Sequence, residues 1–195
     1  MSLPPRVVIL AAGASARLGE PKALVDLGGR AALAHLIEAC GESTPLVISG
    51  AHSSEIAAAF EGQAELLEHT GWSAGRTSSI ASAVRHLPGH DILLAPVDSP
   101  LVPASVFEAL RETWQAAGAP ARGWLSPRDL SSERHGHPIL IGRELAAELL
   151  HLAADAPLRS LRALADPLLE VDVDSPEILD NLDTPLDLAQ MRARF

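Results

Sequence analysis

Short apolar runs alternate with amphipathic stretches through the first 120 residues of the chain. The apolar runs are aliphatic, include β-branched residues, and stop at Gly or polar residues, as buried strands of a parallel sheet do. They cover residues 7–12, 45–49 and 91–97, with a weaker run at 64–68. Helices are expected over residues 31–40, 53–60, 78–87 and 103–117. This alternation predicts a parallel sheet with helices on both faces.

The pattern changes after residue 120. Residues 122–137 are polar and rich in Gly, Pro and Ser, so we expect a loop over the sheet. A short strand at 138–141, a helix at 143–152, a strand at 168–173 and a helix at 185–194 are expected to follow. No long linker or internal repeat interrupts the chain, so a single domain over residues 1–195 is predicted.

Three segments interrupt the alternation directly after a strand or in a long loop. They are residues 13–22, 69–77 and 98–103. In open α/β sheets, ligands bind beyond the carboxyl ends of the strands, where the strand order reverses. We therefore expect these three segments to line one crevice.

The first of these segments lies in a Gly-rich loop, which follows the first strand and carries two cationic side chains. It reads Leu-Ala-Ala-Gly-Ala-Ser-Ala-Arg-Leu-Gly-Glu-Pro-Lys over residues 10–22. Small residues let backbone N–H groups approach a polyphosphate, while Arg17 and Lys22 offer charge to its oxygens. The spacing is neither GxxxxGK[ST] nor GxGxxG. The alternative is a tight strand-to-helix turn with surface cations, which the combined pattern disfavours.

This loop resembles the signature of the MobA-like NTP transferases, Leu-Ala-Ala-Gly-x-Ser-x-Arg-x-Gly-x-x-Lys. The resemblance implies a Rossmann-like three-layer α/β sandwich with a mostly parallel central sheet, of the nucleotide-diphospho-sugar transferase type. It also implies that the loop wraps around a triphosphate and that Arg17 and Lys22 act as catalytic residues on its β- and γ-phosphates. The nucleotide-binding residues implied in this loop are Leu10, Ala11, Ala12, Gly13, Arg17 and Lys22.

A second segment, residues 72–80, looks like the W-x-x-G-M-S-S-S-L motif of the same family. Gly75 would let the backbone approach a base, and Ser78 and Ser79 stand at a helix start, where anions are favoured. The alternative is an ordinary serine-capped helix. The chain departs from the motif at His69, where the family has Asn, and at Arg76, which replaces an apolar residue and is a candidate phosphate or substrate contact.

Two carboxylates are candidate metal ligands, because hard oxygen ligands suit Mg²⁺. Asp98 follows a buried strand in Asp-Ser-Pro, which resembles a family Asp-x-Pro motif whose Asp binds the catalytic metal. The alternative is that Asp98 caps the next helix. Asp183 lies in Asp-Thr-Pro, similar to a C-terminal family motif, and is either a second metal-side carboxylate or a helix cap.

A third motif, Gly136-His137-Pro138, resembles Gly-His-Pro of the cytidylyltransferase branch. It lies before a strand in a polar loop, so these three residues are candidate acceptor contacts. For His137 the alternative of merely holding the loop stays open.

Composition narrows the function classes. The formal net charge of −10 argues against nonspecific nucleic-acid binding, which needs a basic surface. The one cysteine, Cys40, forbids an internal disulfide and is expected to be a buried structural thiol, which favours a cytoplasmic location. No signal peptide and no apolar run long enough to span a membrane are seen, and the histidines lack zinc spacing.

The resemblance predicts a Mg²⁺-dependent nucleotidyltransferase. Ala-Ala-Gly in the loop together with Gly-His-Pro favours CTP over GTP, with molybdopterin or another phosphorylated small molecule as acceptor and a molybdoenzyme as a candidate partner. Guanylyl transfer, or transfer to a sugar phosphate, is the alternative within the same fold. An alternative of another class is a non-catalytic nucleotide-binding accessory protein for a molybdoenzyme.

Overall fold

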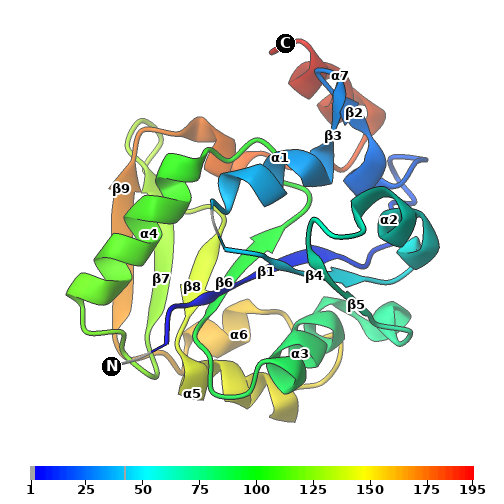
Figure 1. Ribbon diagram of the computed structural model, residues 1–195. Helices are drawn as coiled ribbons and strands as arrows, with labels where there is room; N and C mark the ends of the chain where they lie inside the picture. Colours follow the sequence, from blue (N-terminus) through cyan, green and yellow to red (C-terminus); the bar gives the residue numbers. More distant parts are fainter. Residues whose placement is uncertain (1–2, 42) are drawn as a thin grey trace.

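A seven-stranded sheet forms the centre of the molecule (Figure 1). The computed structural model describes residues 3–41 and 43–195. The strand order across the sheet is β5-β4-β1-β6-β8-β7-β9. The strands are β1 (Arg6–Ala11), β4 (Leu46–Ser49), β5 (Glu65–Glu68), β6 (Ile92–Pro96), β7 (Trp124–Asp129), β8 (Ile139–Ile141) and β9 (Leu168–Val173).

The strand directions place the carboxyl end of β1 at a point where the strand order reverses. β1 pairs in parallel with β4 on one side and with β6 on the other, so Ile9 lies opposite both Val47 and Ala95. The chain continues outward from β4 to β5, whereas β6 leads into the other half of the sheet. β8 is antiparallel to both β6 and β7, and β9 is parallel to β7. The Gly-rich loop leaves β1 at this reversal, where ligands of open α/β sheets bind.

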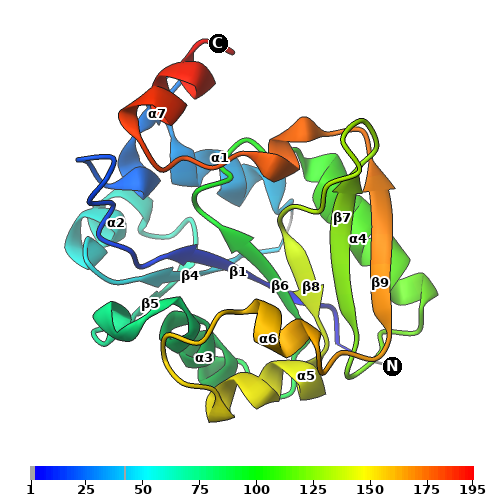
Figure 2. The ribbon, with the colours of Figure 1, turned by 180° about the vertical axis from the view of Figure 1, so that it is seen from behind.

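Helices cover both faces of the sheet (Figures 1 and 2). Successive side chains of a strand point to opposite faces of the sheet, so alternate residues of β1 pack against the helices on one face or the other. Val7 and Ile9 pack in one core cluster with Leu36 of α1, whereas Val8 joins a second cluster with Ile80 of α3. The α-helices are α1 (Ala32–Ala39), α2 (Ser53–Phe60), α3 (Arg76–His86), α4 (Ala104–Ala116), α5 (Arg143–Ala147), α6 (Arg159–Arg162) and α7 (Pro185–Arg192). The three layers confirm the predicted Rossmann-like sandwich with a mostly parallel sheet.

One strand contradicts the sequence analysis. The polar segment 122–137, predicted to be a loop, contains β7, which pairs with both β8 and β9. β8 pairs only with Trp124 and Leu125 of this strand, so Pro127 lies beyond that pairing and its missing N–H costs nothing there. Pairing on both sides buries residues whose own composition reads as a loop. The helix predicted at 143–152 is also shorter, because it turns into a 3-10 helix at Glu148–His151.

A small third core cluster joins the Gly-rich loop to the end of the chain. A two-stranded hairpin of β2 (Asp26–Leu27) and β3 (Arg30–Ala31), which the sequence patterns did not predict, follows a 3-10 helix at Lys22–Leu24. Leu18 of the loop packs in this cluster with residues of the hairpin and with residues of the terminal segment. Its members are Leu18, Val25, Leu27, Ala32, Leu182, Leu188 and Met191. This packing brings the C-terminal segment beside the loop.

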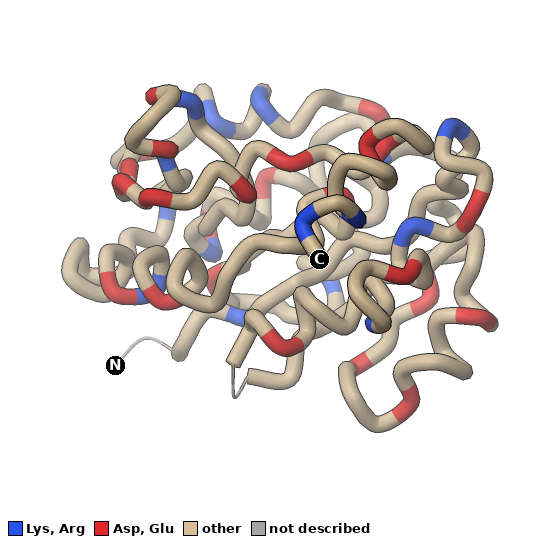
Figure 3. Tube along the Cα trace, turned by 90° about the horizontal axis from the view of Figure 1, so that it is seen from above, with Lys and Arg blue, Asp and Glu red and all other residues tan. Residues whose placement is uncertain are grey.

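The remaining general predictions can be checked directly. Cys40 is buried, its Sγ donates to the carbonyl of Leu36, and burial raises the pKa of its thiol to about 12, as expected of a structural thiol. Acidic residues are spread around the whole trace and interspersed with basic ones (Figure 3). None of the described helices is long and apolar enough to cross a membrane.

Candidate active site

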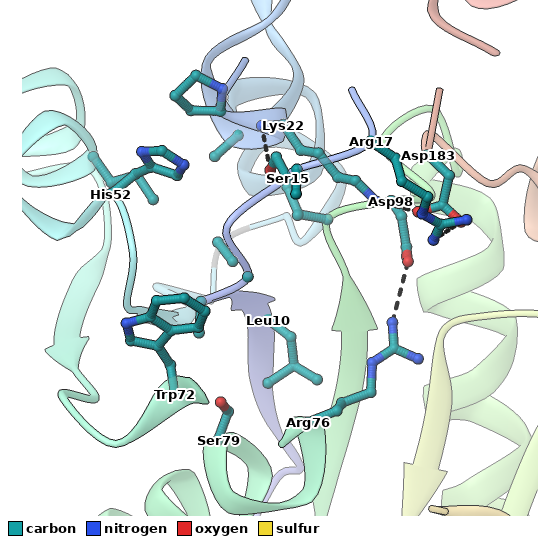
Figure 4. A pocket seen from close by; sticks show the side chains of 18 of the residues that line it. Leu10, Ser15, Arg17, Lys22, His52, Trp72, Arg76, Ser79, Asp98 and Asp183 are labelled. Atoms are coloured by element: carbon teal, nitrogen blue, oxygen red, sulfur yellow. Dashed lines mark hydrogen bonds and ion pairs between the residues drawn. The ribbon is translucent and has the colours of Figure 1, made fainter. Parts of the chain in front are cut away.

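A cavity of about 390 Å³ opens beyond the carboxyl end of β1 (Figure 4). The Gly-rich loop, the start of α2, the turn before α3, the end of β6 and the segment before α7 all contribute to it. Its lining consists of Leu10, Ala11, Ala12, Gly13, Ser15, Ala16, Arg17, Pro21, Lys22, Ala23, His52, Ile56, Trp72, Ser73, Arg76, Ser79, Val97, Asp98 and Asp183. The three segments that the sequence predicted to line one crevice therefore all contribute side chains to one cavity.

The loop is folded upon Ser15. This residue takes the left-handed conformation, with φ of 53°, and its carbonyl accepts hydrogen bonds from the N–H groups of Leu18 and Gly19 at 3.0 Å each. Its Oγ accepts a third hydrogen bond, from the N–H of Lys22 at 3.1 Å. Gly19 also has a positive φ, of 84°, which glycine adopts at little cost. The side chain of Ser15 thus fixes the point where Lys22 begins the 3-10 helix.

Lys22 and Arg17 both bind Asp183 across the cavity (Figure 4). Lys22 Nζ lies 2.5 Å from Oδ1 of Asp183, and Arg17 Nη2 lies 2.9 Å from Oδ2. The Lys22 side chain is 15% exposed, against 71% for Arg17. Lys22 is also the only lysine in the sequence.

The charge environment of Asp183 favours its ionised form. Burial raises the pKa of this carboxyl. The hydrogen bond and charge of Lys22, together with Asn181 and Arg17, lower that pKa by more than burial raises it, so the net shift is downward. Asp183 does not cap α7, because Thr184 is the N-cap and forms a capping box with Asp187. The helix-cap alternative for Asp183 is therefore wrong.

Asp98 has a different counter-ion. Its Oδ2 lies 3.1 Å from Nη2 of Arg76, whose side chain is 56% exposed. The backbone carbonyl of Asp98 accepts a hydrogen bond from the N–H of Leu182 at 2.7 Å, which ties the strand end to the segment that carries Asp183. The helix after Asp98 starts only at Ala104, with Pro103 as its N-cap. Asp98 therefore does not cap that helix.

The two carboxylates of this cavity are a donor set suited to a divalent cation. Asp98 and Asp183 both line it, and each side chain is less than one fifth exposed. Within residues 3–41 and 43–195 there is no cluster of three or more His, Cys, Asp or Glu side chains able to hold a metal. Mg²⁺ is commonly bound by one or two carboxylates, with water and substrate phosphates completing its shell. Two carboxylates beside a cationic loop suit that arrangement.

The structure places two predicted nucleotide contacts outside this cavity. Ser79 lines it, but Gly75 and Ser78 do not. A Cβ on Gly75, whose φ is 137°, would lie 2.5 Å from the carbonyl oxygen of Ala154. The N–H of Ser78 donates to that same oxygen at 3.1 Å, and its Oγ donates to the carbonyl of Gly75. The N–H of Ser78 at the start of α3 is thus bonded within the chain, and the chain near Ala154 packs against Gly75.

A second cavity, of about 200 Å³, adjoins the first and shares Arg76 and Asp98 with it. Of the predicted acceptor contacts, Gly136 and His137 line this cavity and Pro138 does not. The full lining is Arg76, Asp98, Ser99, Arg134, His135, Gly136, His137, Ile178, Leu179, Asp180 and Asn181.

His137 both holds the loop and faces this second cavity. Its backbone N–H donates to the carbonyl of Ile178 at 2.9 Å, and a Cβ on Gly136 would collide with that same carbonyl. The Nδ1 of His137 is buried and has no hydrogen-bond partner among the described residues. Burial lowers the pKa of His137, although Asp98 opposes the shift, so the imidazole is neutral at pH 7.

Sequence reasoning did not assign several lining residues. His52 follows β4 and its ring nitrogen Nε2 lies 3.3 Å from the carbonyl oxygen of Ala14 in the loop. Trp72 packs against Gly50, where any Cβ would come within 2.8 Å of the indole side chain. His52 follows β4 at the same edge of the sheet, so the rule that located the crevice could have found it too. Trp72 lies in segment 69–77, which that rule did include, although no role was assigned to its side chain.

The sheet is mostly parallel, a cation-bearing loop lies at its strand-order reversal, and two carboxylates line the same cavity as that loop. These features define the class: a Rossmann-like α/β protein with a charged cavity at the switch point of its sheet. Within that class the chain belongs to the MobA-like NTP transferase domain family, whose model matches residues 7–171.

Relatives of known sequence and structure agree with this assignment. A molybdenum cofactor guanylyltransferase of Rhizobium meliloti (strain 1021) is 32% identical over 119 residues, which are 58% of this chain and 55% of that protein. The match thus spans about half the length of that relative. Rv0371c of Mycobacterium tuberculosis H37Rv, solved in complex with manganese, superimposes with a TM-score of 0.79 at 22% identity, covering 99% of this chain and 100% of the other. Molybdopterin-guanine dinucleotide biosynthesis protein A of Archaeoglobus fulgidus gives a TM-score of 0.73 at 21% identity, with 97% of each chain covered. The two structures show the fold.

Proposed function

We propose that the protein is a nucleotidyltransferase that moves a nucleoside monophosphate from a nucleoside triphosphate to a phosphorylated acceptor. One observation carries the proposal: Arg17, Lys22, Asp98 and Asp183, from three separate parts of the chain, face one cavity beyond β1. Two cations and two carboxylates are the groups that a triphosphate and its metal ion need. Membership of the MobA-like NTP transferase family supports the same activity.

In the proposed reaction, a phosphate oxygen of the acceptor attacks the α-phosphorus of the triphosphate. The new P–O bond forms as the bond from the α-phosphorus to the β-phosphate oxygen breaks, and pyrophosphate leaves with the electron pair. Because the acceptor oxygen is already anionic at pH 7, no side chain has to remove a proton. Lys22 and Arg17 exchange Asp183 for the β- and γ-phosphates and stabilise the negative charge on the leaving pyrophosphate.

Asp98 and Asp183 are the residues that would hold the metal. A bound Mg²⁺ supplies positive charge at the phosphate oxygens, which lowers the repulsion between the two anionic substrates. The manganese complex of Rv0371c supports a divalent cation in this fold. The loop backbone at Leu10, Ala11, Ala12 and Gly13, and the side chain of Ser79, complete the nucleotide-binding surface that we propose.

The acceptor occupies the second cavity, against Gly136 and His137. We propose molybdopterin as this acceptor, because several of the curated relatives are molybdenum cofactor guanylyltransferases, while others are the bifunctional protein GlmU. The guanylyltransferases among them favour GTP as the nucleotide, whereas Ala11-Ala12-Gly13 favours CTP. Guanylyl transfer is therefore a second candidate beside cytidylyl transfer.

A screen of pyrophosphate release tests the proposal. The protein is incubated with each of the four nucleoside triphosphates, Mg²⁺ and molybdopterin, and thermal shifts are recorded with the same nucleotides. We expect release with one guanine or cytosine nucleotide, and that nucleotide should raise Tm most. Nucleotide binding without any pyrophosphate release would contradict the enzyme and support a non-catalytic accessory protein for a molybdoenzyme.

A further inference from the structure

Arg76 lies on the border between the two cavities and lines both of them. It is the first residue of α3, and its side chain reaches to Asp98 at the end of β6 (Figure 4). The motif that this segment resembles carries an apolar residue at the position of Arg76. The cation is therefore a feature of this chain that the phosphate-binding loop does not explain.

We propose, on the basis of the nucleotidyl transfer proposed above, that Arg76 determines acceptor specificity by exchanging Asp98 for the acceptor. It leaves Asp98 when that carboxylate takes a divalent cation, and its guanidinium then binds an anionic group of the acceptor in the second cavity.

The existing bond between Arg76 and Asp98 is weak enough to be exchanged. It consists of one contact of 3.1 Å, and the Arg76 side chain is 56% exposed. An ion pair with one such exposed partner stabilises a protein little, because water competes for the guanidinium. The pair of Lys22 and Asp183 is different, since both of its side chains are mostly buried. Of the two carboxylates, Asp98 is thus the one that a metal ion can take from its counter-ion more easily.

Once released, the guanidinium finds no unpaired carboxylate among the described residues that line the second cavity. Apart from Asp98, the carboxylate among the described lining residues is Asp180, and two contacts of 2.6 and 2.8 Å already join it to Arg194. Arg134 lines the same cavity and adds a further positive charge. A planar guanidinium fork matches the geometry of phosphate oxygens. The partner that these groups select is therefore a phosphate-bearing acceptor.

The test compares Arg76→Met with Arg85→Met. Arg85 lies on the same helix, is exposed, and lines neither cavity, so its substitution controls for loss of one positive charge. The first measurement is a titration of the nucleotide-free protein with Mn²⁺. The concentration of free Mn²⁺ is measured by its electron paramagnetic resonance signal. Removal of the competing cation should tighten Mn²⁺ binding roughly two- to five-fold in Arg76→Met, as expected for loss of one exposed ion pair, and leave Arg85→Met at the wild-type value.

The second measurement uses inorganic phosphate as the probe of the acceptor site. Calorimetry is done with Mg²⁺ and a saturating α,β-methylene analogue of GTP or CTP, so that the first cavity is filled. We expect phosphate to bind the wild type and Arg85→Met alike, and Arg76→Met about ten-fold more weakly, with the affinity for the analogue unchanged. In turnover, the KM for the acceptor should rise while the KM for the triphosphate stays the same.

Three results would overturn the inference: equal Mn²⁺ affinity in Arg76→Met and wild type, phosphate binding that is absent or insensitive to Arg76, or a weaker affinity for the nucleotide analogue. The last would assign Arg76 to the triphosphate. The Mn²⁺ and phosphate measurements require no turnover. If the wild type releases no pyrophosphate, the proposed function is refuted. The Mn²⁺ and phosphate measurements still decide whether Arg76 exchanges Asp98 for an acceptor anion.

Discussion

Asp98 and Asp183 face the same cavity, yet their surroundings differ. Asp183 is held by Lys22, Arg17 and Asn181, and it links the Gly-rich loop to the end of the chain. Asp98 follows the buried strand β6 and meets one half-exposed arginine. The difference shows that two carboxylates lining one cavity can have different roles. Asp98 is available to a metal ion, whereas Asp183 also organises the cations that receive the phosphates.

The largest effect is expected for Asp98→Asn. The amide keeps the size of the side chain but removes the negative charge, so Mg²⁺-dependent turnover should fall roughly 1,000-fold. The free energy of unfolding should change by less than about 1 kcal/mol, because the ion pair to Arg76 is exposed. Pyrophosphate release and urea denaturation measure the two quantities, with the exposed Asp174→Asn as control. Turnover near the wild-type level would remove Asp98 from the metal site.

Lys22→Ala should follow, with a loss of turnover of roughly 100-fold. The substitution removes a cation from the phosphates and leaves Asp183 with Arg17 as its remaining charged partner. Lys22→Arg keeps the positive charge and should retain more activity, which separates the effect of charge from that of shape. Pyrophosphate release under saturating nucleotide measures both variants. Equal activity of Lys22→Ala and wild type would place Lys22 outside the reaction.

Asp183→Asn sharpens the comparison most directly. Lys22 and Arg17 lose their common counter-ion, and the proposed metal site loses one of its two carboxylates while Asp98 remains, so turnover should fall about 10-fold. Stability should also fall, by about 1–2 kcal/mol, because the bond from Lys22 is charge-assisted and mostly buried. Turnover and urea denaturation are measured together. If turnover fell as far as in Asp98→Asn, the two carboxylates would be equivalent and the contrast between them would be lost.

The smallest effect is a pH dependence. The folded state lowers the pKa of Asp183 below the usual carboxyl value of about 3.9, so this residue stabilises the fold above that pH. The stabilisation is lost as pH falls through the lowered pKa of the folded state. The difference in unfolding free energy between wild type and Asp183→Asn should therefore be constant from about pH 5 upward and shrink below about pH 4. A difference that grew on acidification would contradict the direction of the shift.

Local sequence pattern was enough to predict the central strands and main helices in the first half of the fold, but not the β2–β3 hairpin. The strands β1, β4 and β6 are continuous apolar runs, and the helices between them carry clear periodicity, so each was found to within a few residues. β7 was missed because its burial comes from pairing with β8 and β9 on either side, not from its own composition. Its Pro127 and Arg128 are typical of a loop when the neighbouring strands are unknown.

The candidate site shows the same division. Arg17, Lys22 and Asp98 could be assigned to one crevice because each follows a strand at the same edge of the sheet. The pairing of Asp183 with Lys22 could not, since it depends on packing between Leu18 and the terminal segment, far apart in sequence. Gly75 was interpreted as an approach for a base, but the chain near Ala154 occupies that space. Periodicity carries no information about such a tertiary contact.

A lone lysine also makes this molecule unusually easy to observe. Reductive methylation with ¹³C-formaldehyde would introduce one labelled side-chain amine, at Lys22, besides the amino terminus. Its NMR signal would have to be distinguished only from that of the α-amine. The chemical shift and titration of that single amine would then report, in solution and without turnover, whether it faces a carboxylate or a polyphosphate.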